Sequence, residues 1–573
     1  MLGFGAISEF AISAGGPIPF AGIAGGSAFA TGTPSLIRVS SGLAYGEAVA
    51  FGSMTVTVFA SGAAYGEAFA YGRPNYVIYA STRPFISRPS DQISNQPFVG
   101  RLQQTIQFDR SIVNSDGFGQ VALGWGELTL INLDGYFDST IRKFTSNGRR
   151  VRMTVGKNSR KVNYDNFYTI FDGISSGIHV EEEVVRVFIR DNTFKLETPA
   201  QPNTYTGLGG LGGTTELAGK RIPLVFGYVL NITPSFVIPS LKLFQVHDGP
   251  VNAITAVYSR GATVAFDQDY PDAASLMAAS IIPGRYSTCL SCGLFRVNFV
   301  LEGVVTADVE GDNTDDEFVS TTADIIQRLF SRATEIDEAD IEWSTFVRVN
   351  ELRGADIGYF LSESDESSVA DVVDDLVRGI KGFAGFRPRD NKFEVGVFRL
   401  PTGITPSARY RATDIIDIKR EPLPSGLTPP PRKYQAAWGR NWTPQTDIAG
   451  TVVDVDRIQF LKSPYRLAST SQDDEIAILT DWPQAQVPQP IQSYYRNAED
   501  AQEFVEEQLE MFGFTANSLY RITLKARCFT NNIGGVVNVD YDRFGLDGGR
   551  PLTVVSVSDR TATNESEILG VGP

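Results

Sequence analysis

The chain has 573 residues, 42% of them hydrophobic, and a formal net charge of −16. At roughly 150 residues per domain, this length predicts about four domains. The acidic balance argues against a surface that binds duplex nucleic acid, because such surfaces neutralise phosphates with clustered Lys and Arg.

The first 80 residues carry three tandem copies of a twenty-residue unit, at 21–40, 41–60 and 61–80. In the first half of every copy, each second residue is Gly or Ala, and a period of two is the period of a β-strand. Each first half therefore predicts a strand with one face almost bare of side chain. The second halves are β-branched or aromatic runs that predict return strands, so that the copies form three hairpins. Residues 1–80 are thus predicted to be a Gly/Ala-rich β-repeat arm.

The bare face of the repeat predicts close packing against another backbone or an aromatic surface. Repeats of this size usually stack on one another or on neighbouring chains, so the arm is expected to take part in assembly. The predicted packing face in the second and third copies consists of Gly42, Ala44, Gly46, Ala48, Ala50, Gly52, Gly62, Ala64, Gly66, Ala68, Ala70 and Gly72.

The extreme N-terminus does not predict a targeting signal. The start, MLGFGAISEF, lacks the basic residues that open a secretory signal. From Phe10 to Ile37 no residue is charged, but the prolines and glycines of this stretch make a poor membrane-spanning helix. Residues 3–20 look like a degenerate relative of the repeat.

The rest of the chain divides into a linker and four domains. Residues 81–97 contain three prolines and predict a linker. Residues 98–200 predict an all-β domain, because turn signals separate short strand patterns at 102–108, 126–133, 150–156, 168–174 and 184–190. A flexible Gly-rich connector opens the next segment, 201–310, which is mixed but mostly β, with one short helix at 272–280.

Residues 311–422 predict a small α+β domain with two capped helices. Thr321 caps the first helix and Ser368, with Asp371 three residues later, caps the second. Residues 423–573 begin with a Pro-rich boundary and predict a C-terminal β domain with one helix at 497–512, capped by Asn497. The predicted fold class is therefore mainly β and multi-domain, with a small α+β domain and the N-terminal β-repeat arm.

Cysteines and histidines give no catalytic or metal site. Three cysteines are too few for a disulfide framework and suit a protein made in a reducing cytoplasm. Cys289 and Cys292 form a single CxxC, whereas a zinc site needs four ligands, so a reduced structural pair is predicted. Of the two histidines, His179 is predicted to be an ordinary strand-edge residue, and His247 to lie in a turn.

Two further sequence patterns suggest ligand-binding motifs, but the spacing of their residues does not match those motifs. The run GLGGLGG at 207–213, followed by Gly219-Lys220, does not match a phosphate loop and predicts a connector. The charge run at 308–317 does not match a calcium-binding EF-hand loop and predicts a solvated loop. Since no spacing singles out a pair of carboxylates for glycoside hydrolysis either, the sequence predicts no catalytic residue, cofactor or metal, and not an enzyme.

Several segments resemble the tail-tip or baseplate hub proteins of long-tailed, siphovirus-type bacteriophages. They are scattered over most of residues 98–573. They are 98–108 with Asp109-Arg110-Ser111-Ile112, Gly124-Trp125-Gly126-Glu127-Leu128, 218–227 (AGKRIPLVFG), Asn231-Ile232-Thr233-Pro234, 245–251 (QVHDGPV), Gly293-Leu294-Phe295-Arg296, 305–311 (VTADVEG) and 543–550 (RFGLDGGR) with the strand 552–557. The repeat is similar to the Gly/Ala-Phe-Gly strings that open some of these proteins.

This resemblance implies a structural virion protein located at the tail tip and synthesised in the cytoplasm of the host bacterium. It implies tandem β-barrel or β-sandwich hub domains, 534–557 being the closing barrel element, and a homo-oligomer, normally a trimer. Its partners would be the distal tail ring protein, the tape-measure protein and the receptor-binding fibres or spike. DNA would pass through the lumen without stable binding, to which an acidic chain is suited.

Two alternatives remain open from the sequence. The aromatic-rich repeat is also compatible with a receptor-binding adhesin that contacts a glycan of the host surface. A tail-associated cell-wall hydrolase is the second alternative.

Overall fold

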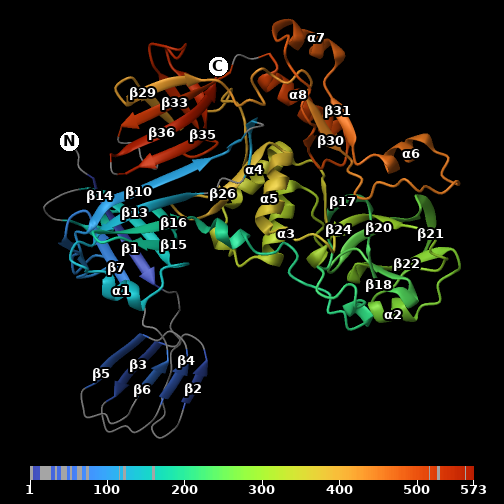
Figure 1. Ribbon diagram of the computed structural model, residues 1–573, viewed down its shortest axis with the longest axis horizontal. Helices are drawn as coiled ribbons and strands as arrows, with labels where there is room; N and C mark the ends of the chain where they lie inside the picture. Colours follow the sequence, from blue (N-terminus) through green and yellow to red (C-terminus); the bar gives the residue numbers. More distant parts are fainter. Residues whose placement is uncertain are drawn as a thin grey trace.

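The computed structural model describes residues 4–573 apart from 13–27, 32–34, 41–47, 52–54, 61–67, 72–75, 115–116, 121–123, 158–161, 515–516, 526–529 and 562. The fold is mainly β, as predicted, with a group of helices between two large sheets (Figure 1).

The larger sheet contains 13 strands and joins segments far apart in the sequence. Its path runs through β29 (Ile415–Glu421), β33 (Ser518–Lys525), β36 (Glu565–Gly572), β35 (Arg550–Arg560), β10 (Leu102–Ser111), β13 (Trp125–Ile131), β16 (Val184–Arg190), β15 (Tyr168–Val180), β14 (Arg150–Lys157), β1 (Phe4–Ile12) and β7 (Tyr76–Ser81), and β34 (Val536–Asp540) pairs with both β35 and β28 (Ala408–Arg411). Because β10 pairs antiparallel with β35, the segments 98–200 and 423–573 share one sheet. The predicted strands at 102–108, 126–133, 150–156, 168–174 and 184–190 all form in it.

The repeat is inserted between β1 and β7, two neighbouring strands of this sheet. β1 and β7 pair antiparallel, with Ile12 opposite Tyr76, so residues 13–75 leave and re-enter the sheet at one point. Residues 4–12 therefore form a strand of the large sheet, and the similarity of 3–20 to the repeat stays a prediction, because 13–20 lie outside the described residues. In Figure 1 the described repeat strands lie below the sheet that carries β1 and β7.

Within the repeat, successive copies pair in parallel, and the prediction of three hairpins was wrong. β2 (Ala28–Thr31), β4 (Ala48–Phe51) and β6 (Ala68–Tyr71) form one parallel sheet, and β3 (Ser35–Ser40) and β5 (Thr55–Ala60) form another. Each residue stands opposite the residue twenty positions later, as Ala48 does to Ala68. The identical length of the copies accounts for this register, because a constant period lets every copy place its strands on the previous one. The second strand of the third copy, β7, pairs with β1 instead.

The second large sheet contains nine strands. Its order is β18 (Ser235–Ile238), β19 (Leu243–Gln245), β23 (Leu294–Val297), β22 (Arg285–Cys289), β21 (Ala262–Asp269), β20 (Val251–Ser259), β24 (Val305–Asp312), β17 (Leu224–Ile232) and β25 (Gly358–Leu361). The short helix α2 (Ala273–Ala278) forms where predicted, with Asp272 accepting from the Ser275 backbone N–H.

Three helices lie between the two sheets (Figure 1): α3 (Thr322–Ala333), α4 (Trp343–Arg353) and α5 (Val369–Gly379). Both predicted caps are confirmed, since Thr321 accepts from the Asp324 backbone N–H and Ser368 forms a capping box with Asp371. The apolar stripes of α3 and α5 are buried in the largest core cluster, together with the hairpin of β26 (Gly382–Phe386) and β27 (Phe393–Val397). This core is the centre of the molecule.

The C-terminal segment has more helix than predicted. It contains α6 (Val455–Lys462), α7 (Gln472–Asp481) and α8 (Ala498–Phe512) beside a small sheet of β31 (Arg466–Ser469), β30 (Gln435–Trp438) and β32 (Ile491–Gln492). Helix α7 starts at a capping box of Ser471 and Asp474, and the spacing of these two residues is a helix-start signal that the sequence contains. Asn497 occupies the N-cap position of α8, but its side chain donates to Asp500 and caps no backbone N–H.

The remaining short elements are α1 (Asp138–Lys143), β8 (Phe85–Ile86) paired with β9 (Pro97–Phe98), and β11 (Val113–Asn114) paired with β12 (Gly117–Phe118). The β8–β9 pair joins the predicted linker at 81–97 to Phe98, the first residue of the next predicted domain. The domain limits given by the sequence stay a prediction.

Candidate functional site

Two of the segments quoted for the resemblance come together on the larger sheet. β10 carries Asp109 and Arg110, and β13 begins at Trp125 and Gly126. The two strands pair antiparallel, with Asp109 directly opposite Trp125. Residues that are distant in sequence therefore form one local site at the carboxyl end of β10.

The two glycines of this site are required by close packing. A Cβ on Gly126 would lie 2.1 Å from the carbonyl oxygen of Gln107, and a Cβ on Gly124 would lie 2.4 Å from the ring of Phe108. Gly124 also donates its backbone N–H to the carboxylate of Asp191 at 2.9 Å. Burial raises the pKa of Asp191 to about 6, although hydrogen bonds from Thr193 oppose this. The glycines and Asp191 thus fix the backbone on both sides of Trp125.

Arg110 is held by a buried ion pair. Its Nη2 lies 3.4 Å from Oε1 of Glu394 on β27, and both side chains are almost fully buried. Desolvation raises the pKa of Glu394, and the charge of Arg110 opposes that rise. This pair fastens β10 of the large sheet to the hairpin beside α5.

Beside this pair, a cavity of about 450 Å³ separates the sheet from helix α5. The sheet supplies Asp109, Ser111 and Trp125, and Trp125 is 63% exposed. The full lining is Asp109, Arg110, Ser111, Gln120, Trp125, Ala370, Asp371, Asp374, Arg378 and Ser556. We call this cavity the Trp125 pocket.

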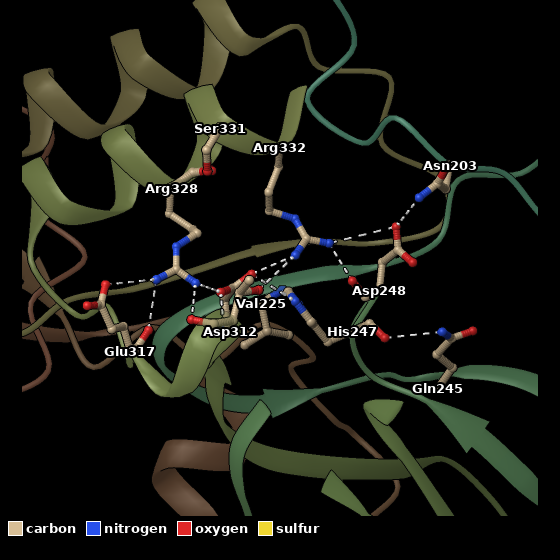
Figure 2. Close-up of polar contacts among 11 residues, drawn as sticks. Asn203, Val225, Gln245, His247, Asp248, Asp312, Glu317, Arg328, Ser331 and Arg332 are labelled. Atoms are coloured by element: carbon tan, nitrogen blue, oxygen red, sulfur yellow. Dashed lines mark hydrogen bonds and ion pairs between the residues drawn. The ribbon is translucent and has the colours of Figure 1, made fainter. Parts of the chain in front are cut away.

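A buried charge cluster lies between the nine-stranded sheet and α3 (Figure 2), and two resemblance segments contribute Val225 and His247 to it. Its centre is Asp312, the last residue of β24, whose side chain is fully buried. Arg328 Nη1 lies 2.5 Å from Oδ1 of Asp312, and Arg332 Nη1 lies 2.8 Å from Oδ2. The two arginines are four residues apart on α3 and so lie on one face of that helix.

His247 completes the cluster from the opposite side. The backbone N–H of Val225 donates to His247 Nδ1 at 2.9 Å, so the ring proton is on Nε2, which donates to Asp312 at 3.2 Å. Burial lowers the pKa of His247, and the hydrogen bond to Asp312 opposes this. Burial also disfavours ionisation of Asp312, but the hydrogen bonds from His247 and the Thr314 backbone N–H and the charge of Arg332 outweigh it and lower the Asp312 pKa.

The charge cluster corrects one prediction. The segment 308–317 was predicted to be a solvated loop, yet 305–312 is strand β24, with Asp308 and Asp312 buried. Only its second half is exposed, at 315–317. His247 lies at a chain bend, where the sequence predicted a turn, and its side chain is fully buried.

The other candidates have structural positions. Cys289 and Cys292 form a disulfide, so the prediction of a reduced pair was wrong. His179 is an exposed residue of β15, in line with the prediction. The predicted flexible connector is a turn with internal hydrogen bonds, such as Gly207 N–H to the Gly212 carbonyl at 2.7 Å. Within the described residues, no group of His, Cys, Asp and Glu is arranged to hold a metal ion.

The predicted packing face of the repeat lies partly outside the described residues. Ala48 and Ala50 are in β4, and Ala68 and Ala70 are in β6, in register with one another. Gly42, Ala44, Gly46, Gly52, Gly62, Ala64, Gly66 and Gly72 lie outside the described residues. The role of the face stays a prediction.

No helix in the described part of the chain has the length and apolar character needed to span a bilayer.

No protein-family model and no curated protein matches the sequence. The search of solved structures found chains with low similarity to this one. A tail protein from Neisseria meningitidis MC58 is 8% identical, with a TM-score of 0.37 over 83% of this chain and 94% of that one. The 43 kDa tail protein of prophage MuSo2 from Shewanella oneidensis is 9% identical, with a TM-score of 0.33 over 84% and 97%. A chain of the native gene transfer agent virion is 12% identical, with a TM-score of 0.40 over 62% and 85%.

Proposed function

We propose that the chain is a structural subunit of the tail tip of a long-tailed bacteriophage. In this role it is a hub that closes the tail tube, anchors receptor-binding fibres or a spike, and opens for DNA ejection. The segments that resemble hub proteins support this proposal, and so does their convergence on the Trp125 pocket and the buried charge cluster.

The observation that carries the proposal is the construction of the repeat arm. Among the described strands, β2 and β6 each pair on one side only, and so do β3 and β5. β7 holds the place in the third copy that β3 and β5 hold in the first two, but it pairs with β1. The edge of β5 opposite β3 thus has no described partner strand.

Unpaired parallel edges expose rows of backbone N–H and C=O groups, which is a liability for a monomer. A strand from another chain can pair with such an edge through its main chain. The arm is therefore suited to assembly, and we take Ala48, Ala50, Ala68 and Ala70, at alternate positions of β4 and β6, as its packing residues. Assembly with copies of this chain in a trimer, and with the distal tail ring, tape-measure and fibre proteins, follows from the hub role.

The geometry of β1 and β7 offers a direct test of the arm. Because Ile12 stands opposite Tyr76, a two-residue Asn-Gly turn can replace residues 13–75 and keep the register. We expect this armless variant to fold, with unchanged hydrogen exchange in β14 and β15, but to lose oligomerisation and incorporation into particles. An armless variant that assembles like the full chain would remove the support that the arm gives to the proposal.

A double substitution tests the packing face itself. Ala48→Leu with Ala68→Leu enlarges two residues that stand opposite each other, whereas Val49→Leu with Phe69→Leu changes the alternate positions of the same strands. We expect the first pair to block assembly and the second to allow it. Equal behaviour of the two variants would contradict a packing role for the Ala positions.

A further inference from the structure

The Trp125 pocket has features that its role in folding does not explain. In the two strands that form it, Gly124 and Gly126 are required by close packing and Arg110 by its ion pair with Glu394. Trp125 contributes nothing comparable, because 63% of its surface is exposed. A large aromatic side chain held on a rigid strand with its surface accessible is characteristic of a binding site.

Asp109 is the second such residue. It stands directly opposite Trp125 in the β10–β13 register and lines the same cavity. Its carboxylate has no hydrogen bond or ion pair with any residue in the described part of the chain. A carboxyl group and an accessible indole are therefore adjacent at the wall of a cavity.

The charges of the cavity leave an excess of negative charge. Arg378 pairs with Asp374 at 2.8 Å, and Arg110 pairs with Glu394 outside the lining. The remaining carboxylates are Asp109 and Asp371, and Asp371 only accepts the hydrogen bonds of the α5 capping box. No cation of the lining is therefore left to neutralise Asp109.

Arg190 stands opposite Trp125 on the other neighbouring strand, β16. It pairs with Glu197 at 2.8 Å, and its guanidinium lies 5.1 Å from the ring centre of Phe194. Its charge is thus engaged away from the pocket, and the indole of Trp125 stays open.

We propose that the Trp125 pocket binds an arginine or lysine side chain presented by a partner protein. The cation lies against the indole face of Trp125, and its N–H groups donate to the carboxylate of Asp109. Arginine fits best, because a planar guanidinium stacks on an indole and pairs with a carboxylate through two hydrogen bonds. The volume of about 450 Å³ also admits the backbone on either side of that residue. Carboxylates at the wall exclude the phosphates of nucleic acid.

The test uses the purified full chain and does not depend on the tail-tip role. The protein is labelled with 5-fluorotryptophan, and the Trp125 resonance, one of five, is assigned by its loss in Trp125→Phe. The probe is the peptide acetyl-Gly-Gly-Arg-Gly-Gly-amide, and the control is the same peptide with citrulline, which keeps the shape of arginine without its charge.

We expect the arginine peptide to shift the Trp125 resonance saturably, with a dissociation constant on the order of millimolar, and the citrulline peptide to leave it unchanged. Asp109→Asn should weaken the arginine peptide roughly tenfold, since it removes the charge but keeps the shape. Asp134→Asn, which removes a carboxylate paired with Arg101 at a distant surface site, should have no effect.

Three results would overturn the proposal. The first is no shift of the Trp125 resonance by the arginine peptide at tens of millimolar, and the second is an equal shift by the citrulline peptide. The third is a shift by an oligosaccharide such as chitotriose without one by arginine, which would make the site a glycan pocket.

Discussion

The substitution Asp312→Asn tests whether the buried charge cluster joins the nine-stranded sheet to helix α3. Asn keeps the size of the side chain and removes the charge that Arg328 and Arg332 both contact. The side chain of Asp312 is fully buried, and those of Arg328 and Arg332 are 10% and 16% exposed. Two arginines would therefore lose their counter-charge where little water can replace it.

Removing one partner of a buried ion pair typically costs about 3–5 kcal/mol. In a chain with several sheets this loss is local, so a single melting temperature is a poor measure of it. Hydrogen exchange measures the local opening free energy directly. Because about 1.4 kcal/mol corresponds to a factor of ten, we expect amides of β24 and α3 to exchange about two to four orders of magnitude faster.

Helix α8 serves as the internal reference, since it makes no contact with Asp312 and its exchange should not change. The matched control is Asp134→Asn, which breaks an ion pair whose carboxylate is 60% exposed and should leave exchange unaltered. Exchange of β24 and α3 in Asp312→Asn within about threefold of the unmodified chain would refute the reasoning, because the cluster would then contribute little to the junction.

Three other expectations follow from the geometry of the two sites. Gly126→Ala should lower the yield of folded protein and speed hydrogen exchange across β10 and β13, because its Cβ would lie 2.1 Å from the Gln107 carbonyl oxygen. Gly177→Ala is the control and should change neither quantity, because no atom lies within 4 Å of its Cβ. Equal yields and equal hydrogen exchange in the two variants would contradict the close packing. The depressed pKa of His247 means that the stability it contributes is present above about pH 6.5 and is lost as the pH falls below that value, since the protonated ring cannot accept from Val225. Asp191, with its pKa raised to about 6, acts in the opposite sense, contributing stability below about pH 4 that is lost as the pH rises through 6. Urea unfolding of the unmodified chain and of His247→Gln, each at pH 8 and pH 5, isolates the contribution of His247. If His247→Gln loses as much stability between pH 8 and pH 5 as the unmodified chain does, His247 does not contribute in this way.

The sequence predicted elements whose signals are local. The caps at Thr321 and Ser368 and the alternation at 184–190 define their elements without reference to the rest of the chain. The repeat shows the limit of such signals, because a period of two identifies a strand but not its partner. Pairing between copies twenty residues apart, and the diversion of β7 to β1, depend on contacts that the local pattern does not contain.

The charge cluster was missed for a related reason. Asp312 was assigned to a solvated loop because it lies in a run of acidic residues, although 305–312 alternates apolar and polar residues as a strand does. The spacing of Arg328 and Arg332, four residues apart on a predicted helix, was a second available signal. Their meeting with His247 depends on the pairing of β17, β20 and β24, which the sequence did not predict.

Location in the virion tests the proposed function most directly. Tailed particles from the bacterium that carries the gene would be labelled with a gold-conjugated antibody raised against residues 98–573 and viewed by electron microscopy. The proposal of a tail-tip hub predicts gold at the distal end of the tail and at no other position. Gold along the length of the tube, or particles that bind none while the soluble chain binds normally, would contradict it.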